Sequence, residues 1–250
     1  MQKGYSNFAS VYDKLISGVS YQKRASYFDK IILQYQKRRG ILVDLGCGTG
    51  SLSEEFNRLG YEVIGIDISE DMLMIANQKR ICSGSDIIYL HQSMQNLDLY
   101  GTVDVFVSAL DSMNHLIVLE DLKRTFEGVA LFLNPQGLFL FDMNTPYKHE
   151  KILANHTFVY DYDDTYLVWQ NTPIANNTIQ IDLDIFNRQQ DGMFSKVSDS
   201  FCERAYTNEQ IKALLENAGL QLLSIYDSDS ERPPQNNSQR IVYVAQKFSK

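Results

Sequence analysis

The chain has 250 residues, of which 44% are hydrophobic and 22% are charged, and its formal net charge is −8 at pH 7. A chain of this length and composition folds as one large domain, or as one domain with a sizeable insertion, and not as a fibre or a disordered tail. The excess of acidic residues repels phosphate backbones, so long nucleic acids are disfavoured as partners.

The cysteines and the apolar segments indicate where the protein works. Cys47, Cys82 and Cys202 are odd in number and far apart in the sequence, which predicts neither a disulfide framework nor a metal site. The first residues form no apolar leader, and the longest apolar stretch, residues 128–141, is interrupted at 134–136. We therefore expect a cytoplasmic protein that does not associate with membranes.

The first half of the chain alternates predicted helices and strands. Aromatic and aliphatic residues at helical spacing predict N-terminal helices over residues 5–39. An apolar strand at 41–45 leads through a glycine-rich turn into a helix at 51–59, which Gly60 ends. The alternation continues with helices from Ser69 to about 80 and at 120–133, and with strands at 61–67, 86–91, 103–108 and 137–143. This pattern predicts a mainly parallel sheet with right-handed crossovers.

The hydrophobic period changes from helical to two residues after Pro146. Residues 178–185 alternate polar and apolar side chains, as expected for an antiparallel strand with one buried face. With neighbours at 158–169 and 193–201, they predict an antiparallel insertion of three strands. The chain then divides into N-terminal helices with the first part of the core, the insertion, and the end of the core, at residues 1–146, 147–206 and 207–250.

The parallel pattern resumes after the insertion. Thr207 and Gln210 have the spacing of a capping box at the start of a helix that Gly219 ends. Two further strands are predicted at 220–226 and 241–245. The whole pattern predicts an α/β fold, with a Rossmann-like sheet of seven strands, N-terminal helices and an antiparallel β insertion.

The turn at residues 46–50 carries the first functional signal. A glycine turn between a strand and a helix lies at the carboxyl edge of the sheet, where α/β folds bind ligands. The dinucleotide fingerprint G-x-G-x-x-G does not fit, because Gly50 comes one residue early. Asp44, at the end of the strand, would repel a phosphate but can pair with an ammonium group of the ligand.

A second acidic residue, Asp67, ends the next predicted strand, seventeen residues after Gly50. A carboxylate at this place can accept hydrogen bonds from both hydroxyls of a ribose. A ribose that carries no pyrophosphate and is joined to an amino acid describes S-adenosylmethionine. The two carboxylates and the turn together therefore predict a site for this molecule.

Two segments, VDLGCGTG at residues 43–50 and VIGIDIS at 63–69, closely resemble the first two motifs of class I S-adenosylmethionine-dependent methyltransferases. Residues 110–116 are similar to the segment after the fourth strand in small-molecule members, including the amino-sugar N-methyltransferases and uncharacterised bacterial relatives. The likeness extends to residues 204–207 and so covers nearly the whole chain. It implies a methyltransferase with S-adenosylmethionine as its cofactor.

The resemblance assigns the cofactor site residue by residue. It implies that the glycine turn holds the methionine end, that Asp67 holds the ribose and that residues 91–97 hold the adenine. The family often has an Asp before Met94, where this chain has Ser93, whose hydroxyl or backbone would contact the adenine. The implied cofactor-binding residues are Tyr12, Asp44, Gly46, Cys47, Gly48, Gly50, Asp67, Ile68, Met72, Ser93, Met94 and Leu110.

The catalytic candidates follow the fourth strand. Positioning supplies much of the acceleration of methyl transfer from a sulfonium, and a general base is needed only where the acceptor atom arrives protonated. His115 is the first candidate base, since imidazole changes its protonation near neutral pH, and Asp111 is a weaker one. Packing or capping roles are open for both, as they are for the candidate substrate contacts Asn114, Trp169, Arg204 and Tyr206.

Three functions are compatible with these motifs. The first is methyl transfer to a nitrogen or oxygen of a small molecule, with the insertion as a lid over the acceptor. The second is methylation of a tRNA wobble base, which the net charge of −8 disfavours. The third is a non-catalytic module that binds S-adenosylmethionine for regulation. The sequence identifies neither the acceptor nor the oligomeric state, for which a monomer and a homodimer are both compatible.

Overall fold

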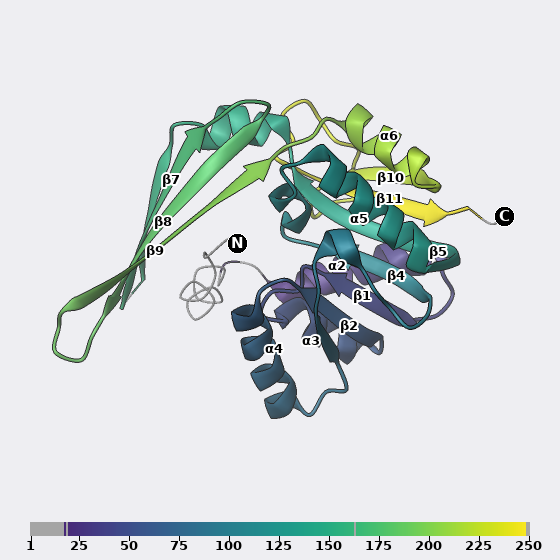
Figure 1. Cartoon of the computed structure of the whole chain (residues 1–250), viewed down its shortest axis with the longest axis horizontal. Helices are drawn as coiled ribbons and strands as arrows, with labels where there is room; N and C mark the ends of the chain where they lie inside the picture. Colours follow the sequence, from purple (N-terminus) through teal and green to yellow (C-terminus); the bar gives the residue numbers. More distant parts are fainter. Residues whose placement is uncertain (1–17, 19, 163, 249–250) are drawn as a thin grey trace.

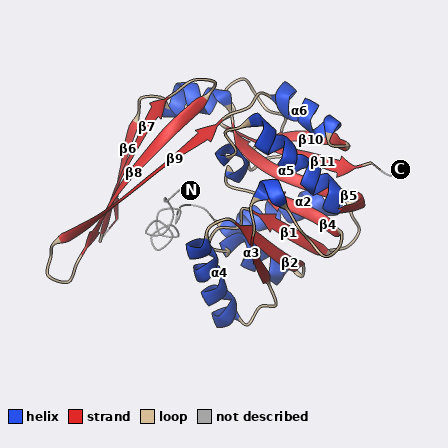
Figure 2. Cartoon of the chain, viewed as in Figure 1, coloured by secondary structure: helices blue, strands red, loops and turns tan. Residues whose placement is uncertain are grey.

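The computed structural model describes residues 18, 20–162 and 164–248. The chain forms a seven-stranded sheet and a separate antiparallel sheet of four strands. Helices lie on both sides of the larger sheet, and the smaller sheet stands apart from it (Figures 1 and 2). The predicted α/β, Rossmann-like fold with an antiparallel insertion is confirmed. Within the described residues, no helix is long and apolar enough to cross a membrane.

The seven-stranded sheet has the order β10-β11-β5-β4-β1-β2-β3. Strand β11 runs antiparallel to both of its neighbours, and the other neighbouring strands are parallel. The carboxyl ends of β1, β2 and β4 therefore meet at one edge. The strands are β1 (Ile41–Leu45), β2 (Glu62–Asp67), β3 (Ile88–His91), β4 (Val103–Ser108), β5 (Leu133–Asn144), β10 (Leu220–Asp227) and β11 (Arg240–Lys247).

Helices cover both faces of this sheet because its central strands are apolar on both sides. In β4, Val105 and Val107 pack in the cluster that includes α2 and α3, whereas Phe106 packs in the cluster that includes α5 and α6. Helix α4 lies beside α3. The helices are α2 (Tyr21–Tyr35), α3 (Ser51–Leu59), α4 (Glu70–Ser83), α5 (Leu119–Phe132) and α6 (Asn208–Asn217), with short turns η1 (Met94–Asn96) and η2 (Ser112–His115).

The helix ends have the predicted chemistry. Gly60 ends α3 at a φ of +98°, and Ser69 accepts a hydrogen bond from the backbone N–H of Met72 at the start of α4. Both bonds of the capping box between Thr207 and Gln210 are present at the start of α6. The predicted helix within residues 5–17 lies outside the described residues.

The insertion has four strands, so the prediction of three was wrong. Residues 158–169, taken as one strand, contain a chain reversal, because Tyr162 pairs with Thr165. These residues are mostly apolar with a short acidic stretch, and their hydrophobic period does not change where the chain reverses. The sheet consists of β6 (Thr157–Tyr162), β7 (Thr165–Pro173), β8 (Thr178–Arg188) and β9 (Phe194–Arg204), preceded by the π-helical η3 (Lys148–Leu153).

The insertion buries one face, as its two-residue period predicts. In β8 the apolar side chains of Ile179, Ile181, Leu183 and Ile185 are buried, and the polar side chains between them point the other way. The sheet projects from the core, and its last strand, β9, returns to the core against η2 (Figure 1). The end of β9 therefore lies beside the segment that follows β4.

Candidate functional site

The glycine turn between β1 and α3 has the geometry that its sequence predicts. Gly46, Gly48 and Gly50 adopt φ values of +79°, +53° and +73°, a region that other residues rarely occupy. A Cβ atom on Gly46 would lie 2.4 Å from Cε of Met94, whereas one on Gly48 would meet nothing within 4 Å. The turn is therefore tight against η1 at Gly46 and open at Gly48.

Asp67, at the end of β2, is tied to the glycine turn by its own carboxylate. Its Oδ2 accepts from the N–H of Gly48, and its Oδ1 accepts from the N–H of Ser69, both at 2.8 Å. Burial raises the pKa of Asp67 above its usual value, although these backbone bonds act in the opposite direction. Each carboxylate oxygen has a remaining lone pair, so the side chain suits a pair of ribose hydroxyls.

Asp44, at the end of β1, is buried beneath the turn with 2% of its surface exposed. Its Oδ2 accepts a 2.6 Å hydrogen bond from the hydroxyl of Ser53. Burial raises the pKa of Asp44 to about 7, and the negative charge of Asp67 adds to this effect. The buried Asp44 and the partly buried Asp67, two carboxylates whose pKa values are raised, make this edge of the sheet attractive to a cation.

A cavity lies beside the turn, and its lining fits the methionine end of S-adenosylmethionine. Asp44 and the glycines occupy one side of it, and Leu110 and Ser112 occupy another. The open space at Gly48 and the excess of negative charge suit a ligand that carries an ammonium and a sulfonium. The described residues that line the cavity are Tyr21, Asp44, Gly46, Cys47, Gly48, Thr49, Ser51, Leu52, Ala109, Leu110 and Ser112.

Four other predicted cofactor residues are described by the structure: Ser93 and Met94 lie at the start of η1, Ile68 follows β2, and Met72 lies in the first turn of α4. Met94 reaches toward Gly46, and Ser93 caps η1 by accepting from the N–H of Gln95. Ile68 is exposed and Met72 is buried. Tyr12 lies outside the described residues.

Cys47 is one of the residues that line the cavity, and its sulfur packs against β2. Its side chain is buried, its N–H donates to the carbonyl of Ile66, and a Cβ atom on Gly65 would lie 3.0 Å from its sulfur. Burial raises the pKa of this thiol well above its usual value. A contact from Cys47 to the cofactor stays a prediction.

Tyr89 on β3 is part of the turn's support, which the sequence analysis missed. A Cβ atom on Gly50 would lie 2.3 Å from the Tyr89 hydroxyl, and one on Gly65 would lie 2.5 Å from its ring. Because the ring of Tyr89 approaches so closely, neither Gly50 nor Gly65 has room for a side chain. An aromatic residue in the third strand, opposite a glycine in the second, was the available signal.

The segment after β4 makes an unusual turn. Leu110 and Asp111 both have a φ of +58°, which is uncommon for residues with a side chain. Their N–H groups donate to the two oxygens of Asp142 on β5, at 3.0 and 2.7 Å. Two consecutive residues in this conformation, held from a neighbouring strand and placed against the cavity, are typical of a functional site.

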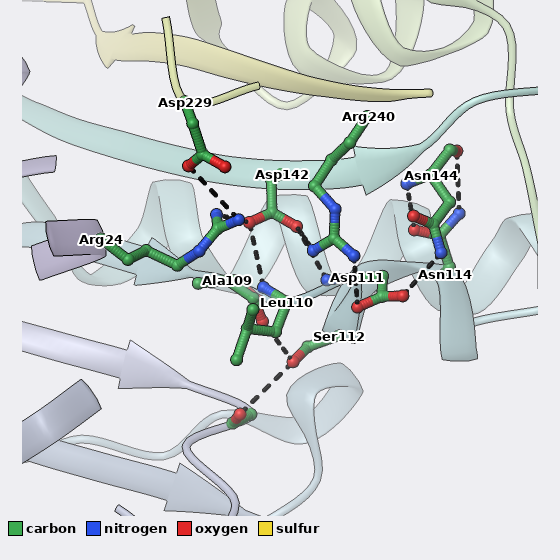
Figure 3. A network of polar contacts seen from close by, with 12 residues as sticks. Arg24, Ala109, Leu110, Asp111, Ser112, Asn114, Asp142, Asn144, Asp229 and Arg240 are labelled. Carbon is green, nitrogen blue, oxygen red and sulfur yellow. Dashed lines mark hydrogen bonds and ion pairs between the residues drawn. The ribbon is translucent and has the colours of Figure 1, made fainter. Parts of the chain in front are cut away.

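Asp142 is the centre of a buried charge network that the sequence analysis did not find (Figure 3). Its carboxylate accepts from Arg24 of α2 at 2.8 Å and from Arg240 of β11 at 3.0 Å, in addition to the two backbone donors. Arg24 also lies 3.5 Å from the exposed Asp229. The network ties the first described helix and the last strand to the turn at residues 110–111.

Asp111, the weaker catalytic candidate, belongs to the same network. Arg240 lies 3.2 Å from its Oδ1, and the amide of Asn144 donates to its Oδ2 at 2.6 Å. Burial acts to raise its pKa, but the positive charges of Arg240 and Lys148 outweigh this and lower the pKa of Asp111 to about 2. A carboxylate that is so strongly held in its charged form is a poor base and a good anchor for the turn.

Asn114 connects three segments through its side-chain amide. Its Oδ1 accepts from the N–H of Asn144, and its Nδ2 donates to the carbonyls of Asn144 and Arg204. Because the side chain is fully buried, it fixes η2 against β5 and the end of β9. A contact from Asn114 to an acceptor stays a prediction.

His115, the first catalytic candidate, lies at the end of η2 with 34% of its side chain exposed. Its Nε2 is 4.0 Å from Oε1 of Glu203, near the end of β9, and its ring packs against Phe201 at a centroid distance of 5.1 Å. The other carboxylate oxygen of Glu203 is 3.6 Å from Nε2 of the buried His149. The sequence analysis missed both Glu203 and His149, because no local pattern joins them to His115.

The remaining predicted substrate residues divide into two groups. Arg204 places its guanidinium 4.7 Å from the centre of the Tyr206 ring and donates to the carbonyl of Ile117, while the buried Tyr206 donates to the carbonyl of Leu116. They hold the segment between η2 and α5. Trp169 packs on the buried face of the insertion and donates to Asn171, far from these contacts along the chain. Acceptor contacts of all three stay predictions.

Comparisons with known proteins agree with this geometry. Residues 42–137 match the family model described as a methyltransferase domain. The methyltransferase homologue YqeM of Bacillus subtilis (strain 168) is 31% identical over 245 residues, which are 97% of each chain. The crystal structure of an S-adenosylmethionine-dependent methyltransferase from Clostridium acetobutylicum ATCC 824 is 29% identical, with a TM-score of 0.90 over 98% of this chain and 99% of that one.

The fold is also shared with a more distant structure. CalS10, an amino pentose methyltransferase from Micromonospora echinaspora solved with S-adenosylmethionine bound, is 17% identical with a TM-score of 0.77. The similarity covers 95% of this chain and 97% of that one. It extends through the insertion as well as the core.

Proposed function

The chain belongs to the class I S-adenosylmethionine-dependent methyltransferases, and from this premise we propose that it methylates a nitrogen or oxygen atom of a small molecule. The observation that carries the proposal is the position of His115. It lies half-exposed at the edge of the sheet where the cofactor binds, with the buried Glu203 behind it. Strand β9 of the insertion ends beside this histidine, so the acceptor would enter between the core and the four-stranded sheet.

S-adenosylmethionine supplies a methyl group on a sulfonium, whose departure as a thioether is already favourable. Asp44 would hold the methionine ammonium, and the carboxylate of Asp67 would hold the ribose hydroxyls. The turn at Leu110 and Ser112 would form the wall between the cofactor and the acceptor, because it lines the cavity at that end. The buried network around Asp142 keeps this wall in place, and the main contribution of the chain is then orientation.

His115 would act on the acceptor as a general base. Its Nε2 lies 4.0 Å from Oε1 of Glu203, and 34% of its side chain is exposed. Asp111 lies one turn of η2 before it, with its charge compensated by Arg240. Both side chains are on the segment that follows β4, which also forms this wall of the cavity.

A transfer assay with radiolabelled S-adenosylmethionine tests the proposal. The purified protein is incubated with a panel of small amines, hydroxylated compounds and nucleotide-linked amino sugars, and separately with total tRNA. We expect label in a member of the small-molecule panel and none in tRNA. Label in tRNA alone would favour the wobble-base alternative, and cofactor binding without any transfer would favour a regulatory module.

A further inference from the structure

Asp199 is a buried carboxylate on β9 that has a partner for only one of its oxygens. The residue is 6% exposed, and its Oδ1 accepts a 2.8 Å hydrogen bond from the N–H of Ser200. Its Oδ2 is buried and has no hydrogen-bond partner within the described part of the chain. Burial raises the pKa of Asp199, and only the backbone N–H acts in the opposite direction. The described side chains therefore leave its charge without a cation.

A carboxylate on the opposite face of the same sheet shows the usual arrangement. Oδ1 of Asp184 lies 2.9 Å from the ammonium of Lys196 and accepts a 2.6 Å hydrogen bond from the hydroxyl of Ser198. A buried carboxylate without such partners destabilises the fold. Asp199 therefore requires a partner that the described residues do not supply, and a ligand is one source of it.

Asp199 ends an apolar row that crosses the buried face of the insertion. It is paired with Leu183 of β8, which is paired with Trp169 of β7, which in turn is paired with Phe158 of β6. Residues that lie opposite each other in antiparallel strands point to the same face of the sheet. The row thus combines three apolar side chains with one carboxylate, the usual composition of a site for a small molecule.

This face of the insertion adjoins the proposed site of methyl transfer. Phe201 follows Asp199 by two residues on β9 and so points to the same face, and its ring packs against His115 at a centroid distance of 5.1 Å. Two residues of a strand span about 7 Å, so Asp199 lies about 7 Å farther from the core than Phe201 along β9. Met72, in the first turn of α4, belongs to the same apolar cluster as the buried face.

We propose that Asp199 is a specificity-determining residue, which anchors a hydroxyl or ammonium group of the acceptor about 7 Å or more from the atom that is methylated. This inference rests on the proposed function and narrows its substrate class to acceptors that carry such a second group. Oδ2 of Asp199 accepts a hydrogen bond from that group, and the apolar part of the acceptor lies against Leu183 and Trp169. The carboxylate takes no part in the transfer itself. It selects the acceptor that is held with its reactive atom at His115.

Urea unfolding of the protein without ligands is the first test, because it requires no acceptor. Asp199→Leu replaces the carboxylate with an apolar side chain of the same branched shape. It should raise the urea midpoint, since an unpaired buried carboxylate is removed. The matched control is Asp184→Leu, which loses the pair with Lys196 and should not raise the midpoint. A lower or unchanged midpoint in Asp199→Leu would overturn the proposal, because the carboxylate would then serve the fold.

Steady-state transfer with a matched pair of acceptors is the second test. The pair consists of the panel member that takes up label and its analogue with hydrogen in place of the distant hydroxyl or ammonium group. In the native protein, KM should be about 10–100-fold higher for the analogue, the usual effect of losing a hydrogen bond to a charged group. In Asp199→Leu the two compounds should have equal KM values, with cofactor affinity within twofold of native. Asp184→Leu should discriminate as the native protein does.

Asp199→Asn identifies which group is anchored. Its amide oxygen still accepts from a hydroxyl, so discrimination should persist for a hydroxyl and be lost for an ammonium. Native discrimination in Asp199→Leu, or a labelled panel member without a second group, would overturn the proposal. A raised urea midpoint in Asp199→Leu together with label only in tRNA would support the anchor and overturn the small-molecule acceptor of the proposed function.

Discussion

The half of the site that the proposed function assigns to the cofactor, around Asp44 and Asp67, and the half that it assigns to the acceptor, around Asp111 and Asp142, are charged in different ways. On the cofactor side, Asp44 and Asp67 are held by a hydroxyl and by backbone N–H groups, with no cationic side chain in their described hydrogen bonds. On the acceptor side, Asp142 and Asp111 are held by the guanidinium groups of Arg24 and Arg240. The carboxylates of the cofactor side therefore remain for the positive charges of the ligand. On the acceptor side, most of the carboxylate charge is neutralised by cationic side chains of the protein.

Because of this difference, mutations in the two halves should affect different properties: ligand binding on the cofactor side and stability on the acceptor side. Removing Asp67 from the cofactor side removes a ligand contact and the acceptor of two backbone N–H groups, but it leaves no cationic hydrogen-bond donor among the described residues without its acceptor. Removing Asp142 leaves the buried guanidinium group of Arg24, the largely buried one of Arg240 and two backbone donors without their shared acceptor, so stability should fall. The predictions below test that separation.

The largest expected effect is on stability. Asp142→Asn should lower the free energy of unfolding by about 3–5 kcal/mol, the cost of breaking a buried ion pair from one side. The measurement is urea unfolding followed by circular dichroism. Asp229→Asn is the matched control, because Asp229 faces the same Arg24 from the surface with 65% of its side chain exposed. It should change stability by less than about 1 kcal/mol, and equal losses in the two variants would contradict the comparison.

The next effect is on cofactor affinity. Asp67→Ala should weaken binding of S-adenosylmethionine by more than about 100-fold, since each ribose hydroxyl would lose a charged acceptor worth about 1.5–3 kcal/mol. Isothermal titration calorimetry measures this directly. Glu70→Ala, which removes an exposed carboxylate from the first turn of α4, should bind as the native protein does. Unchanged affinity in Asp67→Ala would remove the ribose assignment.

The third effect is on the rate of transfer. His115→Ala should slow methyl transfer by about 100-fold, the lower range for a general base, while cofactor affinity stays within twofold. Single-turnover kinetics with the accepted small molecule separates the two quantities. His156→Ala, on the exposed segment before β6, is the control. A native rate in His115→Ala would return this residue to a packing role against Phe201.

The same division explains what the sequence could predict. Asp44 and Asp67 lie at the ends of strands that are visible as apolar runs, the glycines follow the first of these strands, and parallel strands bring such ends together. The cofactor side is thus built from local patterns. The acceptor side joins residues that no local pattern connects, as with Arg24 and Asp142, which are 118 positions apart.

One signal for the acceptor side was nevertheless present in the sequence. Asp142 is a single charge inside the apolar strand 138–143, and a buried charge requires partners from elsewhere in the fold. That signal predicts a cation but not which one. The fourth strand of the insertion was missed for a related reason, because the pairing of Tyr162 with Thr165 leaves no mark in the hydrophobic period.

The smallest expected effect is the pH dependence of cofactor binding. Affinity for the cofactor should rise with pH, whereas the contribution of Asp44 to stability should fall. Asp44 has a pKa of about 7 in the free protein, and pairing with an ammonium requires its charged form. Affinity for S-adenosylmethionine should therefore fall about tenfold per pH unit below 7. The folded-state pKa lies above the unfolded value, so the contribution of Asp44 to stability is full below about pH 4 and is lost as the pH rises toward 7.

Calorimetry and urea unfolding between pH 5 and 8, in the native protein and in Asp44→Asn, measure the two trends together. In the native protein, affinity should rise with pH while the Asp44 contribution to stability falls. Asp44→Asn should bind weakly at every pH and lose both dependences, because its amide does not titrate. If the variant kept the native pH dependence of affinity, the ammonium would be held by another group. The protein itself would then balance the negative charges of the cofactor side, as it does on the acceptor side.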